Sequence, residues 1–125
     1  MTEYRLTESE TRLAELIWEH APIHSPVLFE LVSERLNWKK TTMYTVLRKL
    51  CDKGVFKNEY MLVTPLISRD EFYARQSVKY VDDTYDGSLP RFIAAFANGR
   101  GLTDTQADEI QRLIDEYRKG GGNND

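Results

Sequence analysis

The sequence predicts a mainly α-helical chain, in which three helices and a short β-ribbon precede a second helical segment. Apolar residues recur at steps of three and four along most of the chain, and glycine or proline separates most of these segments. β-Branched and aromatic residues concentrate in one short stretch, 55–67. We therefore expect a first domain at residues 1–67, a helical domain at 68–119 and a disordered tail at 120–125.

The first predicted helix has a clear start and a clear end. Thr7 followed by Glu10 is a capping-box pattern, in which each side chain satisfies a free backbone N–H at the helix start. Apolar residues then recur at helical spacing until Pro22, so we expect the helix to end at about His20.

The second predicted helix begins at Ser25-Pro26. We expect the serine hydroxyl to cap the helix and the proline to take the first helical position, where its missing N–H costs nothing. An apolar stripe follows as far as Leu36, and Asn37-Trp38 is the expected turn out of the helix.

The third predicted helix has two chemically different faces and ends at Gly54, a typical C-terminal cap. Its apolar positions share one face, and they are Met43, Val46, Leu47 and Leu50. The opposite face carries Thr41, Tyr44, Thr45, Arg48 and Asp52, with Lys49 at its flank.

Residues 55–67 read as two short strands with a turn near 58–60, and Pro65 closes the second strand. Three helices followed by such a ribbon form the winged variant of the helix-turn-helix. In that arrangement the third helix can enter a DNA major groove about 12 Å wide. Threonines allow close approach, arginine can reach guanine, and lysines can meet phosphates.

The second half of the chain has three short helical segments, each with a capping pattern or a break before it. Ser68 with Glu71 and Thr103 with Gln106 are capping boxes, and residues 85–88 form a break. Helices of this length bury too little surface to fold alone, so they need either the winged domain or a second copy to cover them. A symmetric dimer is the commonest solution, and we expect it here. The residues expected in that homodimer interface are Leu89, Phe92, Ile93, Phe96, Ile110, Leu113, Ile114 and Tyr117.

The charge of the chain is unevenly distributed. The whole chain carries −3, but residues 35–57 carry +6 and residues 58–125 carry −4. A basic block of this kind fits a phosphate-bearing partner such as double-stranded DNA, and it also fits an ordinary solvated helix face. Charge alone does not choose between the two interpretations.

Several classes of protein find little support in the sequence. It has no glycine-rich phosphate loop, nucleophile elbow or HExxH motif, so we expect no enzyme activity and no cofactor. His20 and His24 are separated by Pro22, and Cys51 is the single cysteine, so we expect no metal site. No apolar run approaches the ~20 residues of a membrane span, and the first residues do not form a signal peptide. We therefore expect no membrane partner and a cytoplasmic location.

The order of these motifs resembles the penicillinase and methicillin-resistance repressor family (BlaI/MecI/CopY type) across nearly the whole chain. The resemblance rests on Thr-x-x-Glu at 7–10, Leu-Ile-Trp-Glu-His at 16–20, Asn-Trp-Lys-Lys-Thr-Thr at 37–42, Leu-Arg-Lys-Leu-Cys-Asp-Lys-Gly at 47–54, Thr64-Pro65 and Tyr-Asp-Gly-Ser-Leu at 85–89.

This resemblance implies a homodimeric repressor that binds an operator with dyad symmetry and dimerises through its C-terminal helices. It also implies a sensor or protease partner. The DNA-facing positions would be Lys40, Thr41, Thr42, Thr45 and Arg48, with Lys49 and Lys53 near the DNA backbone. We expect Lys39 to hold the DNA backbone as well. Tyr44 lies on the same face and fits either a DNA contact or a solvent-edge aromatic residue.

The chain departs from the family pattern in four places. It has Lys39-Lys40-Thr41 where the family usually has Ser-Pro-Lys, and its wing is shorter and lacks a basic tip. It also lacks the cysteine-rich tail of the copper-responsive branch, and Ala95-Phe96 stands where the β-lactam branch is cleaved at Asn-Phe. Base preference, wing contact and regulation therefore do not follow from the resemblance.

A winged-helix module that binds proteins without sequence-specific DNA binding remains the alternative, and the sequence does not separate repressor from activator.

Overall fold

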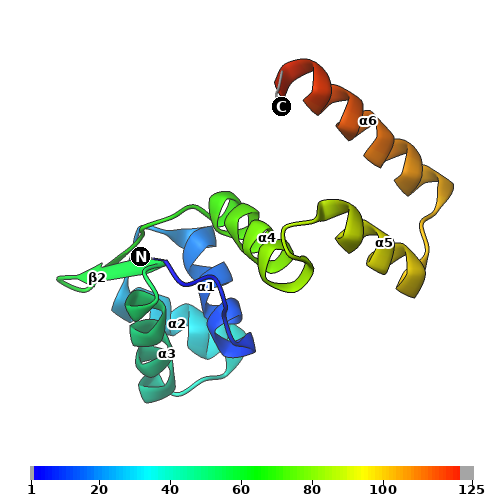
Figure 1. Ribbon diagram of the computed structural model, residues 1–125. Coiled ribbons are helices and arrows are strands. Elements are labelled where there is room, and N and C mark those ends of the chain that lie inside the picture. The colour runs from blue at the N-terminus through cyan, green and yellow to red at the C-terminus, as the bar shows by residue number, and fades with distance from the viewer. Residues whose placement is uncertain (1, 122–125) are drawn as a thin grey trace. The chain divides into compact units, whose positions relative to one another are not determined.

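The computed structural model describes residues 2–121 and contains the expected mainly helical architecture (Figure 1). The helices are α1 (Glu8–His20), α2 (Ser25–Leu36), α3 (Lys40–Asp52), α4 (Arg69–Tyr85), α5 (Leu89–Arg100) and α6 (Asp104–Gly121). The strands are β1 (Ile23–His24), β2 (Phe56–Glu59) and β3 (Leu62–Pro65). The predicted fold class, a winged helix followed by a helical arm, is confirmed.

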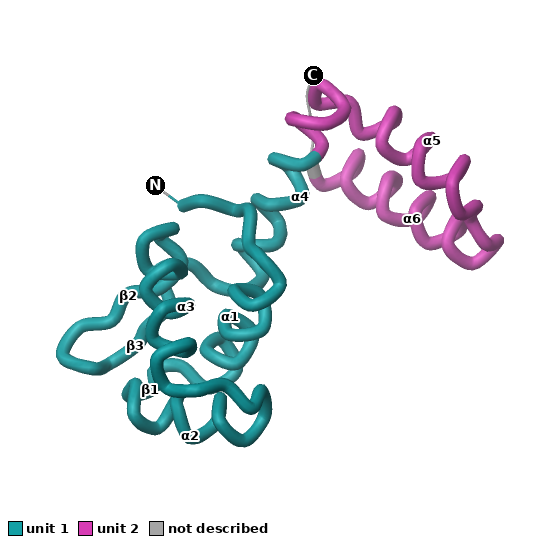
Figure 2. Tube along the Cα trace, turned by 90° about the horizontal axis from the view of Figure 1, so that it is seen from below, with its two compact units in different colours: residues 1–80 teal, residues 81–125 magenta. Residues whose placement is uncertain are grey.

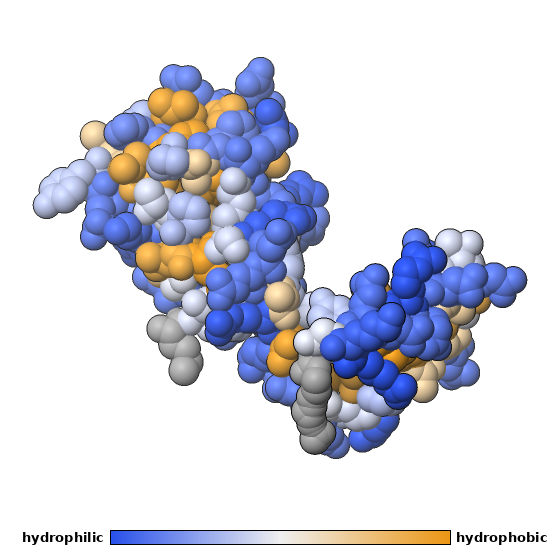
Figure 3. Space-filling model, turned by 90° about the horizontal axis from the view of Figure 1, so that it is seen from above, coloured by the Kyte–Doolittle hydropathy of each residue, from blue (hydrophilic) through white to orange (hydrophobic). Residues whose placement is uncertain are grey.

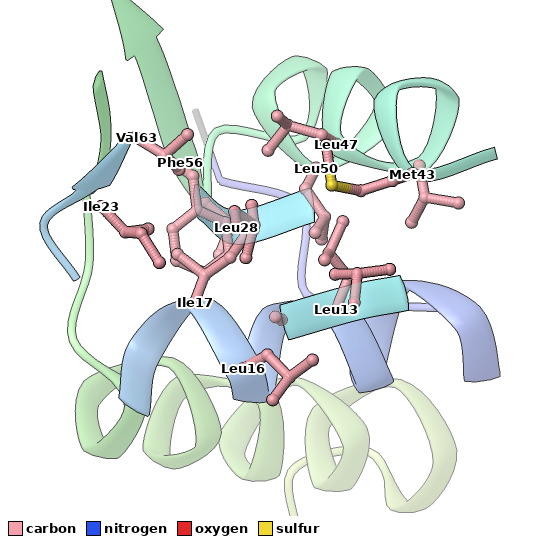
Figure 4. Close-up of a cluster of buried hydrophobic side chains, with 14 of the residues drawn as sticks. Leu13, Leu16, Ile17, Ile23, Leu28, Met43, Leu47, Leu50, Phe56 and Val63 are labelled. Atoms are coloured by element: carbon pink, nitrogen blue, oxygen red, sulfur yellow. The ribbon is translucent and has the colours of Figure 1, made fainter. Parts of the chain in front are cut away.

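The chain forms two compact units, residues 1–80 and residues 81–125 (Figure 2). The first unit contains α1 to α3, the sheet and most of α4. Its core brings together one face of each helix and the inner side of the sheet, as Figure 4 shows. The side chains of this core with no exposed surface include Leu13, Ile17, Leu28, Val32, Met43, Leu50, Val55, Val63 and Phe72.

The sheet has three antiparallel strands in the order β1-β3-β2, rather than the two-stranded ribbon that we expected. β1 pairs with β3 through Ile23 opposite Val63. A strand of two residues is too short to show an alternating pattern, and its partner lies far along the chain. The hairpin turn falls at Tyr60 and Met61, slightly later than expected, and both residues have a positive φ (53° and 67°) as a tight hairpin turn requires.

The predicted cap of α1 is confirmed, and the predicted cap of α2 is wrong. Glu10 N–H donates to Thr7 Oγ1 at 3.1 Å, and Thr7 N–H donates to Glu10 Oε1 at 2.9 Å. At α2, His24 is the N-cap residue and contributes no side-chain hydrogen bond, while Ser25 is the first helical residue and is buried. The serine hydroxyl is therefore turned inward, where it can serve a tertiary contact.

The first unit extends into α4, past the boundary at residue 67 that we expected. Phe72 is fully buried, and its ring centroid lies 5.4 Å from that of Trp18 and 5.3 Å from that of Tyr4. Glu15 accepts hydrogen bonds from Arg69 Nε at 2.8 Å and from the Tyr73 hydroxyl at 2.7 Å. Burial and the hydrogen bond to Glu15 raise the pKa of Tyr73 to about 12. The first turns of α4 thus complete the core of the first unit.

The second unit contains the end of α4 with α5 and α6, and its described side chains are all at least partly exposed. Ser88 caps α5 through the N–H of Arg91, and Thr103 and Gln106 form the predicted capping box before α6. The expected tail begins at Gly120, which lies in α6, and residues 122–125 lie outside the described part of the chain. Each described helix is too short or too polar to span a lipid bilayer.

The burial of Phe72 can be tested by unfolding. Phe72→Ala should lower the free energy of unfolding of the first unit by about 3–5 kcal/mol, because it leaves a cavity among packed aromatic rings. Urea unfolding followed by tryptophan fluorescence measures this loss. The control is Val78→Ala on the same helix, which is exposed and should change stability by no more than about 0.5 kcal/mol. Equal effects of the two substitutions would contradict the packing described above.

Candidate nucleic-acid interface

One face of α3 is buried and the other is open to solvent. Met43, Val46, Leu47 and Leu50 are buried against α1, α2 and the sheet, as their spacing predicted. Because of the helical period, the residues between them point outward, except for half-buried Tyr44. The exposed residues of α3 and its N-cap include Lys39, Lys40, Thr41, Thr42, Thr45, Arg48 and Lys49. We call these seven residues the α3 outer face.

The cations of the α3 outer face are free of internal ion pairs. Within residues 2–121, no carboxylate forms a salt bridge with Lys39, Lys40, Arg48 or Lys49. The remaining cations of the basic block are paired. Arg35 lies 3.4 Å from Glu19, Lys53 lies 2.6 Å from Glu10, and Lys57 lies 3.4 Å from Glu59. The unneutralised positive charge of the block is therefore concentrated on one helix face.

The N-terminus of α3 adds to this positive potential. Its N-cap residue, Lys39, provides no side-chain hydrogen bond to the first-turn amides, and the first turn carries no acidic residue. Backbone N–H groups at a helix start and the helix dipole both attract anions. The first turn of α3 can therefore bind a phosphate with backbone amides as well as with lysine side chains.

Tyr44 is oriented differently from its neighbours on the helix. Its side chain is half-buried, and its hydroxyl donates to Ser25 Oγ at 3.0 Å. The backbone N–H of Ser25 in turn donates to the carbonyl of Met61 at 2.8 Å. This chain of contacts links α3, the start of α2 and the hairpin turn. Sequence reasoning missed the role of Ser25, because no local pattern relates it to Tyr44.

The wing, which is the hairpin of β2 and β3, has an aromatic tip without a free positive charge. Tyr60 is 98% exposed and Met61 is 59% exposed at the hairpin turn. Lys57, the cation of β2, pairs with Glu59 on the same strand. This tip therefore differs chemically from the basic α3 outer face.

The predicted dimerisation residues lie on the second unit, where apolar residues remain uncovered. Figure 3 shows hydrophobic residues at its surface among hydrophilic ones. A groove of about 240 Å³ between α5 and α6 is lined by Phe92, Ile93 and Phe96 on one side and by Ile110 on the other. Phe92, Ile93 and Ile110 are half-buried, whereas the exposed members of the predicted interface are Leu89, Phe96, Leu113, Ile114 and Tyr117.

The histidines and the cysteine show no arrangement for metal binding in the described part of the chain. Within the described part of the chain, no three histidine, cysteine or acidic side chains come together as a metal site would need. His20 Nδ1 lies 3.0 Å from the carbonyl of Leu16 in its own helix. Burial, and then the charge of Asp52, raises the pKa of the Cys51 thiol, which lowers its reactivity.

The contact between Tyr44 and Ser25 predicts a stability effect. Tyr44→Phe should lower the free energy of unfolding by about 1 kcal/mol, because the buried Ser25 hydroxyl loses its donor. The matched control is Tyr60→Phe, which removes a hydroxyl from a side chain that is 98% exposed and should have no measurable effect. Chemical denaturation of both variants measures the difference. No difference between them would mean that the hydrogen bond contributes nothing.

Comparison with known proteins agrees with this architecture. The family model described as "Penicillinase repressor" matches residues 6–116. A "Penicillinase repressor" from Bacillus licheniformis is 20% identical over 118 residues, covering 91% of this chain and 92% of that protein. An "Uncharacterized 16.5 kDa protein in ptsI 3'region" from Latilactobacillus sakei is 22% identical over 116 residues, covering 87% and 77%. The chain therefore belongs to the penicillinase repressor family of DNA-binding transcriptional repressors.

Proposed function

We propose that this protein is a sequence-specific repressor that binds, as a homodimer, an operator with dyad symmetry. The observation that carries the proposal is the α3 outer face, where four unpaired cations and three exposed threonines share one side of a helix. Free cations suit phosphates, and short polar side chains let a helix approach base edges closely. The proposal assigns the DNA binding of the family to the α3 outer face of this chain.

Each part of the α3 outer face has a distinct role in this proposal. Arg48 lies in the second half of α3 and is long enough to form a bidentate contact with guanine. Thr42 and Thr45 contact bases or the sugar-phosphate backbone, and Thr41 lies beside them. Lys39, Lys40 and Lys49 bind phosphates and fix the position of the helix along the groove.

The second unit provides the homodimer contact in this proposal. Leu113 and Ile114 are 52% and 42% exposed, and the unit has no fully buried side chain among its described residues. A helical segment with so little internal burial gains stability by covering its apolar stripe with a second copy. A two-fold dimer also presents two α3 helices to the two halves of a palindromic site.

The alternative function is a protein-interaction module that uses the winged-helix unit without reading DNA. The exposed aromatic wing tip is the observation that favours it, because Tyr60 and Met61 offer an apolar contact. Two properties separate the alternatives: a DNA-reading protein selects one duplex over random DNA, and its affinity falls steeply with salt.

We also propose a cytoplasmic location and regulation by a sensor or protease partner as in the family, although Ala95-Phe96 is not the Asn-Phe pair cleaved in the β-lactam branch.

The two kinds of DNA contact predict different binding behaviour. Arg48→Ala should weaken binding to an operator by about 1–3 kcal/mol with little effect on random DNA, because it removes a base contact. Lys40→Ala should weaken binding to both duplexes similarly. It should also reduce the salt dependence of the affinity by the amount that one lost phosphate contact accounts for. Fluorescence anisotropy at several salt concentrations, on a duplex selected from a random pool by the wild-type protein, measures both. Equal losses on operator and random DNA for Arg48→Ala would refute its role in base recognition.

The homodimer contact predicts a change in mass. Ile114→Glu should weaken dimerisation roughly 100-fold, because it places an unpaired charge within an apolar interface. Sedimentation equilibrium of the full chain measures the dissociation constant. The control, Thr105→Glu, adds the same charge at the exposed start of α6, outside the apolar stripe, and should leave the dimer intact. A dimer that tolerates both substitutions would place its interface elsewhere.

A further inference from the structure

Lys53, the residue directly after α3, is turned into the protein rather than toward solvent. Its Nζ donates to Glu10 Oε1 at 2.6 Å and to the carbonyl of Arg5 at 2.7 Å. The Lys53 side chain is 26% exposed, and the Glu10 side chain is 4% exposed. Lys49, one turn earlier on the same helix, is exposed and forms no ion pair within the described residues. The two lysines therefore occupy opposite environments.

Glu10 is held as a buried carboxylate by several contacts. Its Oε1 accepts from Lys53 Nζ and also from the backbone N–H of Thr7 at 2.9 Å, as part of the capping box of α1. Burial alone would raise the pKa of Glu10, but the hydrogen bonds from Lys53 and Thr7 and the charge of Lys53 lower it below its ordinary value. Glu10 is therefore ionised at neutral pH and needs the Lys53 ammonium as its counter-charge.

The N-terminal segment donates hydrogen bonds to backbone carbonyls at the same end of α3. The N–H of Glu3 donates to the carbonyl of Lys53 at 2.7 Å, and the Thr2 hydroxyl donates to the carbonyl of Gly54 at 3.4 Å. The carbonyl of Tyr4 accepts from Gln76 of α4 at 2.6 Å. Side-chain and backbone contacts thus fix the C-terminal end of α3 to the start of α1 and to the N-terminal segment, which itself contacts α4.

We propose that Lys53 is a positioning residue for DNA recognition, which holds α3 in place through its ion pair with buried Glu10 and does not itself bind a phosphate. The inference rests on the proposed function and assigns to Lys53 a role different from the backbone contact that the family resemblance implied. Two of the three N–H bonds of the Lys53 ammonium donate to these internal acceptors. Moving the ammonium outward to a DNA phosphate would leave the Glu10 charge buried and unpaired. That cost exceeds the gain from one solvent-exposed contact.

The salt dependence of DNA binding separates positioning from phosphate binding. Lys53→Met keeps the aliphatic stem but removes the charge, and Lys49→Met is the matched control. We expect Lys53→Met to lower the ratio of its affinity for the selected operator to its affinity for random duplex about tenfold. The salt slope, that is the slope of log affinity against log salt concentration, should stay at the wild-type value. Lys49→Met should instead lower the slope by about 0.9 and leave that ratio nearly unchanged. The measurement is fluorescence anisotropy on the duplex selected by the wild-type protein, at a temperature where every variant is folded.

Two further variants keep the test decisive if Lys53→Met folds poorly. Lys53→Arg preserves the counter-charge of Glu10 and should restore the operator preference. The double variant Glu10→Gln/Lys53→Met removes both charges, so it should be more stable than Lys53→Met while its operator preference stays reduced. In a double-mutant cycle of unfolding at pH 7, the two substitutions should be strongly non-additive.

Two results would overturn the inference. If the salt slope of Lys53→Met is lower by about 0.9, Lys53 binds a phosphate. If folded Lys53→Met keeps the wild-type operator preference, the ion pair stabilises the fold and has no role in DNA recognition. Failure of the proposed function has a different appearance, because the wild-type protein itself would then select no duplex. The double-mutant cycle would still report the coupling between Glu10 and Lys53 in that case.

Discussion

The burial of one face of α3 is the constraint on which the rest of the first unit depends. Met43, Leu47 and Leu50 are covered by α1, α2 and the sheet, so the rotation of α3 about its axis is fixed. The same rotation brings the threonines and Arg48 to the surface, because a helix cannot bury one face without exposing the other. The apolar core and the proposed DNA-reading face are therefore two consequences of one packing arrangement.

Contacts at both ends of α3 limit its remaining freedom to slide or tilt. Near its N-terminal end, Tyr44 is joined to Ser25 and through it to the hairpin turn. At its C-terminal end, Lys53 is joined to Glu10 and the N-terminal segment. Neither contact needs to touch DNA to influence recognition, since an error of about 1 Å in a reading helix is enough to break a bidentate contact with a base. Residues that hold the helix are thus as important to the proposed function as residues that face the groove.

The two units differ in how they obtain stability. The first unit has a closed core, completed by the aromatic contacts of Phe72 with Trp18 and Tyr4. The second unit exposes the apolar side chains of α5 and α6 and contains no fully buried residue in its described part. This difference supports the proposal that the first unit folds around its own core and that the second buries its apolar side chains against a second copy.

The sequence by itself determined the features that depend on local periodicity and capping. The apolar stripes predicted the helices and the buried face of α3, and Thr7 with Glu10 predicted the start of α1. The basic block predicted where the candidate site would lie. Only the tertiary structure decided which of its cations remain free, because the ion pairs of Lys53 and Arg35 join residues far apart in the chain. The same reason explains strand β1, the inward hydroxyl of Ser25 and the transfer of Phe72 to the first unit, since each depends on a partner that no local pattern identifies.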